Sequence, residues 1–312
     1  MGLCQVKNNP EIKKVFPMKI LIIGKDGQIG VVLQKKLLPL GEVIGTNREK
    51  LNLQNLDAIK ATINSIKPDI IINTAAYTKV DQAEKEKELA YQINTLAPQV
   101  IAKEAEMLDI PLIHFSTDYI FDGLKKDAYL EIDQTNPLST YAKTKWEGEK
   151  LVYQHPKHII LRVGWVFDAY GKNFLNTILQ LIQEKKSLRI INDRWGTPTS
   201  VDLIADIVFR IVKDIKSQAG FENFGTYHLA SKGETNWYEY ACYISNEAIQ
   251  LGFKTQMNAS SIKKITSDEY FSLAKRPLHS LLNTEKIQKT FKLDLPFWQE
   301  SVTKTLREKI IK

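Results

Sequence analysis

A tyrosine and a lysine four positions apart, Tyr141 and Lys145, are the residues whose types and spacing point most directly to chemistry. A free phenol has a pKa of about 10, too high for it to exchange protons readily at neutral pH. A neighbouring lysine ammonium favours the phenolate and lowers that pKa toward the working range. Residues at this spacing leave the same face of a helix. The pair therefore predicts a general acid that protonates a carbonyl oxygen as hydride arrives at the carbonyl carbon.

Two hydroxyl residues, Ser116 and Thr117, precede this pair at the end of a predicted strand. Residues 112–115 form the short, mostly apolar run that is typical of a central parallel strand. Open α/β sheets place ligands at the C-terminal ends of their strands, where a hydroxyl can stabilise charge on a carbonyl oxygen. The helix that carries Tyr141 is predicted to begin with Asn136 as its N-cap and Pro137 at the first helical position.

The Tyr-x-x-x-Lys spacing is weak evidence alone, because about one copy is expected by chance in a chain of this composition. A second copy, Tyr153 and Lys157, contains Pro156, which disfavours a continuous helix there. The first copy is distinguished by its context, namely the capped helix, the preceding hydroxyls and a glycine-rich turn near the start of the chain.

That glycine-rich turn, with Gly24, Gly27 and Gly30, follows a predicted strand at residues 18–23 and opens a predicted helix at residues 28–38. This context is the one in which such a turn binds a dinucleotide. Gly24 permits the tight turn, Gly27 lets the backbone approach a pyrophosphate, and Gly30 lets helix and strand pack closely. The phosphates are expected at the helix N-terminus. The alternative is a turn that merely joins strand to helix.

The end of the second predicted strand, residues 42–46, bears on the choice of cofactor. An NAD enzyme places an acidic residue there to hold the ribose diol. Here Arg48 occupies this region, and the first acid is Glu49. Arg48 would pair with a 2′-phosphate, which favours NADPH, although NADH and an ordinary surface arginine both remain open.

Strands and helices alternate through the N-terminal half. Further strands are predicted at residues 68–74, continued by the small residues Ala75 and Ala76 and then Tyr77, and at residues 157–163. Residues 81–108 are predicted to be largely helical, with a break or kink at Pro98. This alternation predicts an α/β fold with a doubly wound, parallel Rossmann-type sheet.

The chain divides on this basis into three parts. Residues 1–17 are an expected N-terminal extension, and residues 18–167 an expected dinucleotide-binding domain. Residues 168–312 are expected to form mainly a smaller, discontinuous substrate-binding lobe, from which helix 200–216 returns to the sheet. Such a lobe closes over the strand ends, where a substrate pocket belongs.

Composition narrows the classes of function. The chain has 312 residues, 43% of them hydrophobic, and a formal net charge of +7. Its lysines are spread among acids on predicted helix faces, so an anionic small substrate is favoured over nucleic acid. No apolar run is long enough for a membrane span. The two cysteines, Cys4 and Cys242, fit a reducing cytoplasm, and the histidine spacing predicts no metal site.

Taken together, the sequence resembles the extended short-chain dehydrogenase/reductase family, and within it the dTDP-4-dehydrorhamnose reductase branch. The similarity runs from about Met18 to the C-terminus. The matching stretches, in order, are GKDGQIG at 24–30, INTAAYTKVDQAE at 72–84, HFSTDYIFDG at 114–123, NPLSTYAKTKWEGE at 136–149, LRVGWVF at 161–167, GKNF at 171–174, INDRWGTPT at 191–199, GTYHLA at 225–230, TNWYEYA at 235–241 and KRPLHSLLNTEK at 275–286.

The resemblance implies NADPH-dependent reduction of the C4 keto group of a dTDP-6-deoxy-L-hexose, giving dTDP-L-rhamnose. It makes Thr117, Tyr141 and Lys145 the catalytic residues, with Lys145 also holding the nicotinamide ribose. The implied cofactor-binding residues are Gly24, Gly27, Gln28, Ile29, Gly30, Arg48, Ala75, Ala76, Tyr77, Tyr141 and Lys145. The implied substrate-binding residues are Thr117, Asp118, Trp165, Asn173 and Arg276. For Trp165 a core position, and for Arg276 a surface salt bridge, are the alternatives.

Three residues depart from the family pattern: Val32 replaces a glutamate of a magnesium-linked dimer, Gly164 a common serine and Asn52 a common aspartate. Neither a metal nor that dimer is therefore expected, while a homodimer of another kind remains open. Two alternative functions also stay open. One is a 4-reductase for a different nucleotide-6-deoxyhexose, and the other is a non-catalytic, NADP-binding regulatory subunit.

Overall fold

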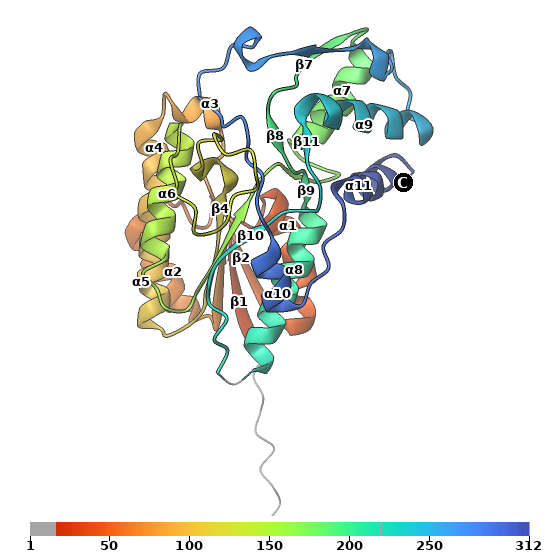
Figure 1. The fold of residues 1–312 in the computed structure, drawn as a ribbon. Coiled ribbons are helices and arrows are strands. Elements are labelled where there is room, and N and C mark those ends of the chain that lie inside the picture. The colour runs from red at the N-terminus through yellow and green to blue at the C-terminus, as the bar shows by residue number, and fades with distance from the viewer. Residues whose placement is uncertain (1–16, 219, 312) are drawn as a thin grey trace, which may run out of the picture.

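The centre of the molecule is a six-stranded sheet in which all strands run parallel. In the computed structural model, which describes residues 17–218 and 220–311, the strand order is β10-β5-β4-β3-β1-β2 (Figure 1). The strands are β1 (Met18–Ile23), β2 (Gly41–Thr46), β3 (Ile70–Asn73), β4 (Leu112–Thr117), β5 (His158–Val163) and β10 (Gly225–Leu229). The predicted doubly wound parallel sheet is confirmed. The expected N-terminal extension lies almost wholly outside the described residues.

The strand order explains why the ends of β1, β3 and β4 are the functional edge. Along the chain the sheet grows outward from β1 to β2, then restarts on the other side of β1 with β3 and continues through β4 and β5. Ligands bind in open α/β sheets at the point where the strand order reverses. The register sets Asn73 of β3 opposite His114 of β4, and Thr117 of β4 opposite Val163 of β5.

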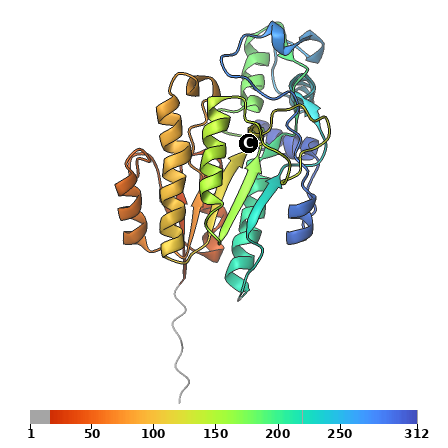
Figure 2. The ribbon, with the colours of Figure 1, turned by 60° about the vertical axis from the view of Figure 1, so that its left-hand side comes forward.

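Helices cover both faces of this sheet, because its strands are apolar on both sides. One face carries α2 (Leu56–Ile66), α5 (Ala97–Met107) and α6 (Thr140–Val152), and the other carries α1 (Gln28–Lys36) and α8 (Val201–Ser217) (Figures 1 and 2). Each face has its own buried cluster of aliphatic side chains. The strand ends are therefore held between two packed layers.

A smaller lobe stands beyond the C-terminal ends of the strands (Figure 1). It is built from α7 (Phe174–Glu184), β7 (Leu188–Ile191), α9 (Trp237–Gln250), β12 (Ile262–Ile265) and α11 (Trp298–Ile310). Their apolar faces form a separate buried cluster. The remaining short elements are the strands β6 (Val166–Phe167), β8 (Trp195–Gly196), β9 (Thr199–Ser200) and β11 (Thr235–Asn236) and the 3₁₀ turns η1 (Leu38–Leu40), η3 (Asp118–Ile120), η4 (Ala259–Ser261) and η5 (Ser267–Glu269).

The C-terminal half contributes more to the main sheet than the sequence pattern indicated. Helix α8 packs on α1, as expected for helix 200–216, but β10 also pairs with β5, and α10 (Glu285–Phe291) packs on β10. Strand β10 had been expected in the lobe, and α10 and β12 had not been predicted. Aromatic packing explains why α10 lies on β10, since the ring centroids of Tyr227 in β10 and Phe291 in α10 are 5.3 Å apart.

The predicted long helix over residues 81–108 is broken into four segments. These are α3 (Val80–Ala83), α4 (Lys87–Tyr91), the π-helical segment η2 (Gln92–Leu96) and α5. Pro98 lies in the first turn of α5, where its missing N–H costs nothing. The main irregularity, η2, comes just before it and places the buried Asn94 beside Tyr77 and Thr144.

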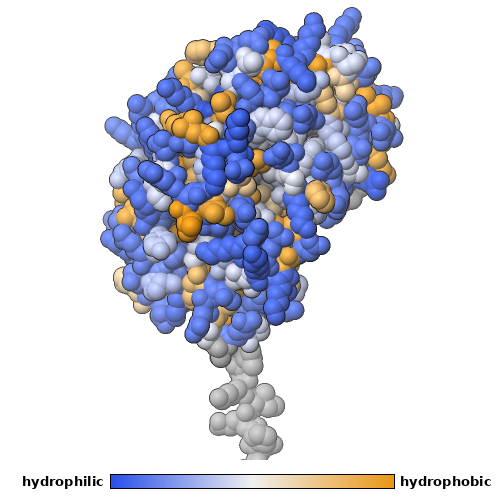
Figure 3. Space-filling model, viewed as in Figure 1, coloured by the Kyte–Doolittle hydropathy of each residue, from blue (hydrophilic) through white to orange (hydrophobic). Residues whose placement is uncertain are grey.

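The visible surface is mainly polar. The face in Figure 3 shows mostly hydrophilic side chains with apolar ones scattered among them. Within residues 17–218 and 220–311, the helices are too short or too polar to cross a membrane.

Candidate active site

Helix α6 presents the Tyr–Lys pair, but it begins later than the sequence suggested. Its first residue is Thr140 and its N-cap is Ser139, whose hydroxyl accepts from the Ala142 N–H at 3.3 Å. The prediction of Asn136 as N-cap and Pro137 as first helical residue is wrong. The Asn136 amide is bonded elsewhere, to the Asp122 carboxylate at 3.2 Å.

A second group fixes the start of α6 from another element. The carboxylate of Glu84, at the end of α3, accepts from the Thr140 N–H at 2.8 Å and from the Thr140 hydroxyl at 2.7 Å. A negative charge at a helix N-terminus is stabilising. Tyr141 is therefore held in the first turn of α6 by two caps.

Tyr141 faces the end of β4. Its ring packs edge-on against Tyr119 with centroids 6.4 Å apart, and hydrogen bonding to Thr117 favours its phenolate. The Thr117 hydroxyl has a single proton, which it can donate instead to the Asp118 carboxylate at 3.1 Å. The structure thus brings together the predicted hydroxyl and the predicted phenol. Tyr153 of the second Tyr–Lys pair lies beyond the end of α6 and is 63% exposed.

Lys145 is buried one turn further along α6. Its Nζ donates to the Phe115 carbonyl at 2.6 Å and lies 3.5 Å from His114 Nε2. Burial lowers the pKa of Lys145 to about 8, against the charge of Glu149, which raises it.

The expected lowering of the Tyr141 pKa is not what this arrangement produces. Burial, together with the charge of Asp118, raises the pKa of Tyr141 to about 12, although the hydrogen bond with Thr117 lowers it. The reason is that the Lys145 ammonium points to β4, where the Phe115 carbonyl accepts from it. The phenol is thus held protonated, which is the form that a general acid needs.

The glycine turn fits a dinucleotide pyrophosphate. Gly24 has φ +91°, and a Cβ there would lie 2.8 Å from the Ala75 nitrogen. Helix α1 starts at Gln28 with Gly27 as an N-cap that offers no side-chain bond, and its first turn has no acid. Its N-terminal amides are therefore free of side-chain caps and suit an anion.

We expect Gly30→Ala to destabilise the fold by about 1–3 kcal/mol, as overpacking does. A Cβ at residue 30 would lie 2.2 Å from the Gly24 carbonyl oxygen, a backbone atom that cannot move freely. The control is Gly27→Ala, whose Cβ would meet that oxygen at an ordinary 3.4 Å and whose φ is −73°. Urea unfolding of both variants measures the difference. Equal unfolding midpoints for the two variants would contradict the expectation.

The other predicted cofactor residues lie around this turn. Arg48 is exposed just beyond β2, and Ile29 packs against the core under α1. Ala75 and Ala76 are half-buried after β3. The polar groups of Tyr77 are bonded within the chain: its N–H donates to Asn94 Oδ1 at 2.8 Å, its carbonyl accepts from Asn94 Nδ2, and its hydroxyl donates to Glu86.

Asp118 is a buried carboxyl beside Thr117. Burial raises its pKa to about 7, and its Oδ2 has no hydrogen-bond partner among the described residues. A Cβ at Gly164 would lie 2.5 Å from this carboxyl group. Glycine at 164, where the family pattern commonly has serine, therefore leaves the space that Asp118 occupies.

Trp165 lies between the main sheet and the lobe. Its ring stacks on Trp237 with centroids 4.4 Å apart, and a Cβ at Gly196 would collide with it. Its backbone has φ +48°, a strained conformation for a bulky residue. Such strain persists only where the surroundings impose it.

The remaining predicted substrate residues tie the lobe to the dinucleotide-binding part. Asn173 caps α7, and its Nδ2 donates to Gln28 Oε1 at 2.8 Å, which joins a predicted substrate residue to a predicted cofactor residue. Arg276 forms a two-point ion pair with Asp81 of α3, so the salt-bridge alternative describes its contact in this structure.

Sequence reasoning missed two pairs of buried polar groups behind the site. Arg162 of β5 binds Glu149 of α6 with its Nη2 and Nε at 2.6 and 3.0 Å. Asn73, the last residue of β3, lies 3.1 Å from His114 in the middle of β4. The only available signal was a polar residue within or at the end of an otherwise apolar strand run, which does not identify its partner.

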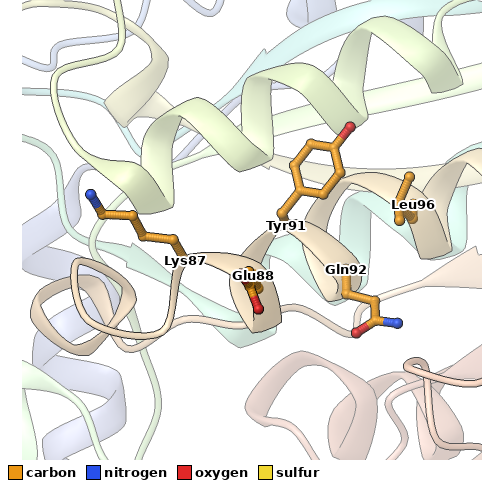
Figure 4. Close-up of a pocket in the computed structure, with 5 residues that line it drawn as sticks. All are labelled: Lys87, Glu88, Tyr91, Gln92 and Leu96. Atoms are coloured by element: carbon orange, nitrogen blue, oxygen red, sulfur yellow. The ribbon is translucent and has the colours of Figure 1, made fainter.

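Surface hollows lie elsewhere. One is on α4 and η2 (Figure 4), lined by Lys87, Glu88, Tyr91, Gln92 and Leu96. Another lies between α8 and residues 293–305. None of the predicted site residues lines either hollow, so neither belongs to the Tyr–Lys site.

The doubly wound sheet, the glycine turn at β1 and the Tyr–Lys helix beside β4 define the class of dinucleotide-dependent short-chain reductases. A family model described as the RmlD substrate binding domain matches residues 18–310. The chain is 40% identical to a dTDP-4-dehydrorhamnose reductase of Escherichia coli strain K12, over 93% of this chain and 98% of that protein. It is 32% identical to a spore coat polysaccharide biosynthesis protein of Bacillus subtilis, with 93% and 98% covered.

Solved structures agree. A dTDP-4-dehydrorhamnose reductase of Bacillus anthracis in complex with NADP superposes with a TM-score of 0.86 at 29% identity, covering 94% of this chain and all of that one. An orthologue from Clostridium acetobutylicum gives 0.85 at 34% identity, with 93% and 99% covered. The chain belongs to the dTDP-4-dehydrorhamnose reductase family, and the predicted resemblance is confirmed.

Proposed function

We propose that this protein reduces the C4 keto group of dTDP-4-dehydro-6-deoxy-L-mannose with NADPH and thereby forms dTDP-L-rhamnose. The observation that carries the proposal is the arrangement at the end of β4, where Tyr141 of α6 is hydrogen-bonded with Thr117. Family membership over nearly the whole chain supports the same activity.

Each of the three catalytic residues has a distinct role in this proposal. The bound nicotinamide supplies hydride to the carbonyl carbon. Tyr141, protonated because burial raises its pKa, donates its proton to the carbonyl oxygen as negative charge builds there. Thr117 orients that oxygen by hydrogen bonding. Lys145, on the same face of α6, holds the nicotinamide ribose.

The cofactor is held by the chain in two places. The α1 N-terminus and the turn around Gly24 receive the pyrophosphate, and Arg48 pairs with the 2′-phosphate, which favours NADPH over NADH. NADP in the structure of the Bacillus anthracis relative supports this choice. Val32 in place of glutamate gives no support for a metal-linked dimer. We further infer a cytoplasmic location, consistent with the free thiol of Cys242.

On the substrate side, Trp165 packs against the sugar ring, while Asp118, Asn173 and Arg276 bind the polar groups of the sugar nucleotide. The Asp81 partner of Arg276 would have to share it with the diphosphate. A buried carboxyl next to the reacting carbonyl suits a sugar hydroxyl as its hydrogen-bond partner.

The test is an NADPH-oxidation assay across a panel of 4-keto-6-deoxyhexose nucleotides. We expect oxidation with the dTDP-linked L-sugar and at least tenfold slower oxidation with NADH. Turnover of a different nucleotide sugar instead would replace the proposed substrate. Absence of oxidation with every sugar, together with retained NADPH binding, would support a non-catalytic regulatory subunit.

A further inference from the structure

A chain of buried polar groups connects Lys145 to the cofactor side of the sheet. The Ala75 N–H donates to Asn73 Oδ1 at 3.2 Å, Asn73 Nδ2 lies 3.1 Å from His114 Nδ1, and His114 Nε2 lies 3.5 Å from Lys145 Nζ. Asn73, His114 and Lys145 are each at most 2% exposed. In such a setting every donor needs an acceptor, because water cannot substitute.

The Ala75 backbone amide fixes the donor and the acceptor of each hydrogen bond in this series. The Ala75 amide can only donate, so it fixes Oδ1 of Asn73 toward itself and Nδ2 toward His114. Turning the Asn73 amide over would set two donors against each other and leave the half-buried Ala75 N–H without this acceptor, at a cost of about 1–3 kcal/mol. His114 Nδ1 must therefore accept.

We propose that Asn73 holds His114 in the tautomer with its proton on Nε2, so that this N–H faces Lys145 Nζ and favours the uncharged amine. An ammonium has only donors, so one of its N–H groups would face the imidazole N–H. An amine has two N–H groups and one lone pair. One N–H reaches the Phe115 carbonyl at 2.6 Å, and the lone pair accepts from His114.

The surrounding charges are consistent with a neutral ring. Burial and the Lys145 charge hold the pKa of His114 well below its usual range, and burial lowers the pKa of Lys145. The other titratable groups on α6 around Lys145 are Tyr141, one turn before it, and Glu149, one turn after it. Glu149 favours the ammonium, but it is paired with Arg162.

His114 and Asn73 are thus positioning residues that act through Lys145 and set the pH at which the site loses its positive charge. This consequence for catalysis rests on the proposed reductase function. The tautomer itself does not, so the two ideas can be tested separately.

The decisive measurement is the ¹⁵N spectrum of histidine-labelled full-length protein, in which couplings to the ring protons distinguish Nδ1 from Nε2. The His114 signals are assigned by their loss in His114→Gln. We expect a neutral ring with its proton on Nε2 at neutral pH. A proton on Nδ1, or on both nitrogens, would overturn the proposal, and the wild-type spectrum suffices for this decision.

Asn73→Asp tests the link to Lys145. A carboxylate accepts from Nδ1–H, so the tautomer should reverse and Nε2 should accept from the ammonium. The Lys145 titration, followed by ¹³C-lysine labelling and assigned with Lys145→Met, should move up by about one pH unit or more. Reversal of the tautomer without such a shift would disprove the coupling.

A matched control is Asn94→Asp, which replaces another fully buried amide close to α6. Asn94 contacts Tyr77 and Thr144 Oγ1 but not His114, so the tautomer should stay unchanged. If the wild-type protein shows no reductase activity but His114 carries its proton on Nε2, the proposed function is disproved and the inferred tautomer is still supported.

Discussion

Replacing Tyr141 by phenylalanine should lower the turnover of the 4-keto sugar by a factor on the order of 10²–10⁴, as loss of a general acid does. The change removes only the hydroxyl and keeps the ring that packs on Tyr119. Binding of NADPH, followed by fluorescence titration, should be retained. The turnover number is the quantity to compare, at saturating cofactor and substrate.

Tyr153→Phe is the matched control for this substitution. Tyr153 belongs to the other Tyr-x-x-x-Lys sequence of the chain, but it is 63% exposed and lies past the end of α6. Its loss should leave turnover within a factor of about two, as expected for a surface change. Wild-type turnover in Tyr141→Phe would exclude Tyr141 as the acid.

The second large effect concerns stability. Arg162→Ala should lower the free energy of unfolding by about 3–5 kcal/mol, because it leaves Glu149 as an unpaired buried charge. The two side chains are 5% and 2% exposed. Arg162 also donates to the Glu131 carbonyl and lies 3.2 Å from His228 Nε2, both of which would lose a partner.

Two comparisons isolate this buried ion pair in urea unfolding. Arg189→Ala removes an ion pair to Glu269 whose partners are 63% and 49% exposed, and should cost no more than about 1 kcal/mol. The double variant Arg162→Met/Glu149→Gln removes both charges and should recover much of the lost stability. Equal losses of unfolding free energy in Arg162→Ala and Arg189→Ala would show that burial does not make the Arg162–Glu149 ion pair more important for stability.

The buried ion pair also illustrates why part of the site could not be predicted. Glu149 lies two turns after Tyr141 on α6, and Arg162 lies thirteen positions later on β5. In the sequence both look like ordinary surface charges. Only the packing of α6 on β4 and β5 turns them inward, where Ser116 also donates to Glu149.

The start of α6 also depends on contacts that the local sequence does not reveal. Asn136-Pro137 is a good local signal for a helix N-terminus, yet Ser139 caps the helix. Asn136 does not cap the helix because its amide donates to Asp122, while the Glu84 carboxylate accepts from the Thr140 N–H and stabilises the later start. A cap is worth only about 1 kcal/mol, which tertiary hydrogen bonds readily exceed.

The sequence by itself determined the parallel sheet, the dinucleotide turn and the hydroxyl–Tyr–Lys set. These follow from local patterns: apolar runs that must be buried, glycines at a strand end and side chains four residues apart on a helix. The tertiary structure alone decided the return of β10 and α10 to the sheet, the ion pair of Arg276 with Asp81 and the protonation of the site. A pKa depends on burial and on which charges face the group, so it exists only once distant segments have packed together.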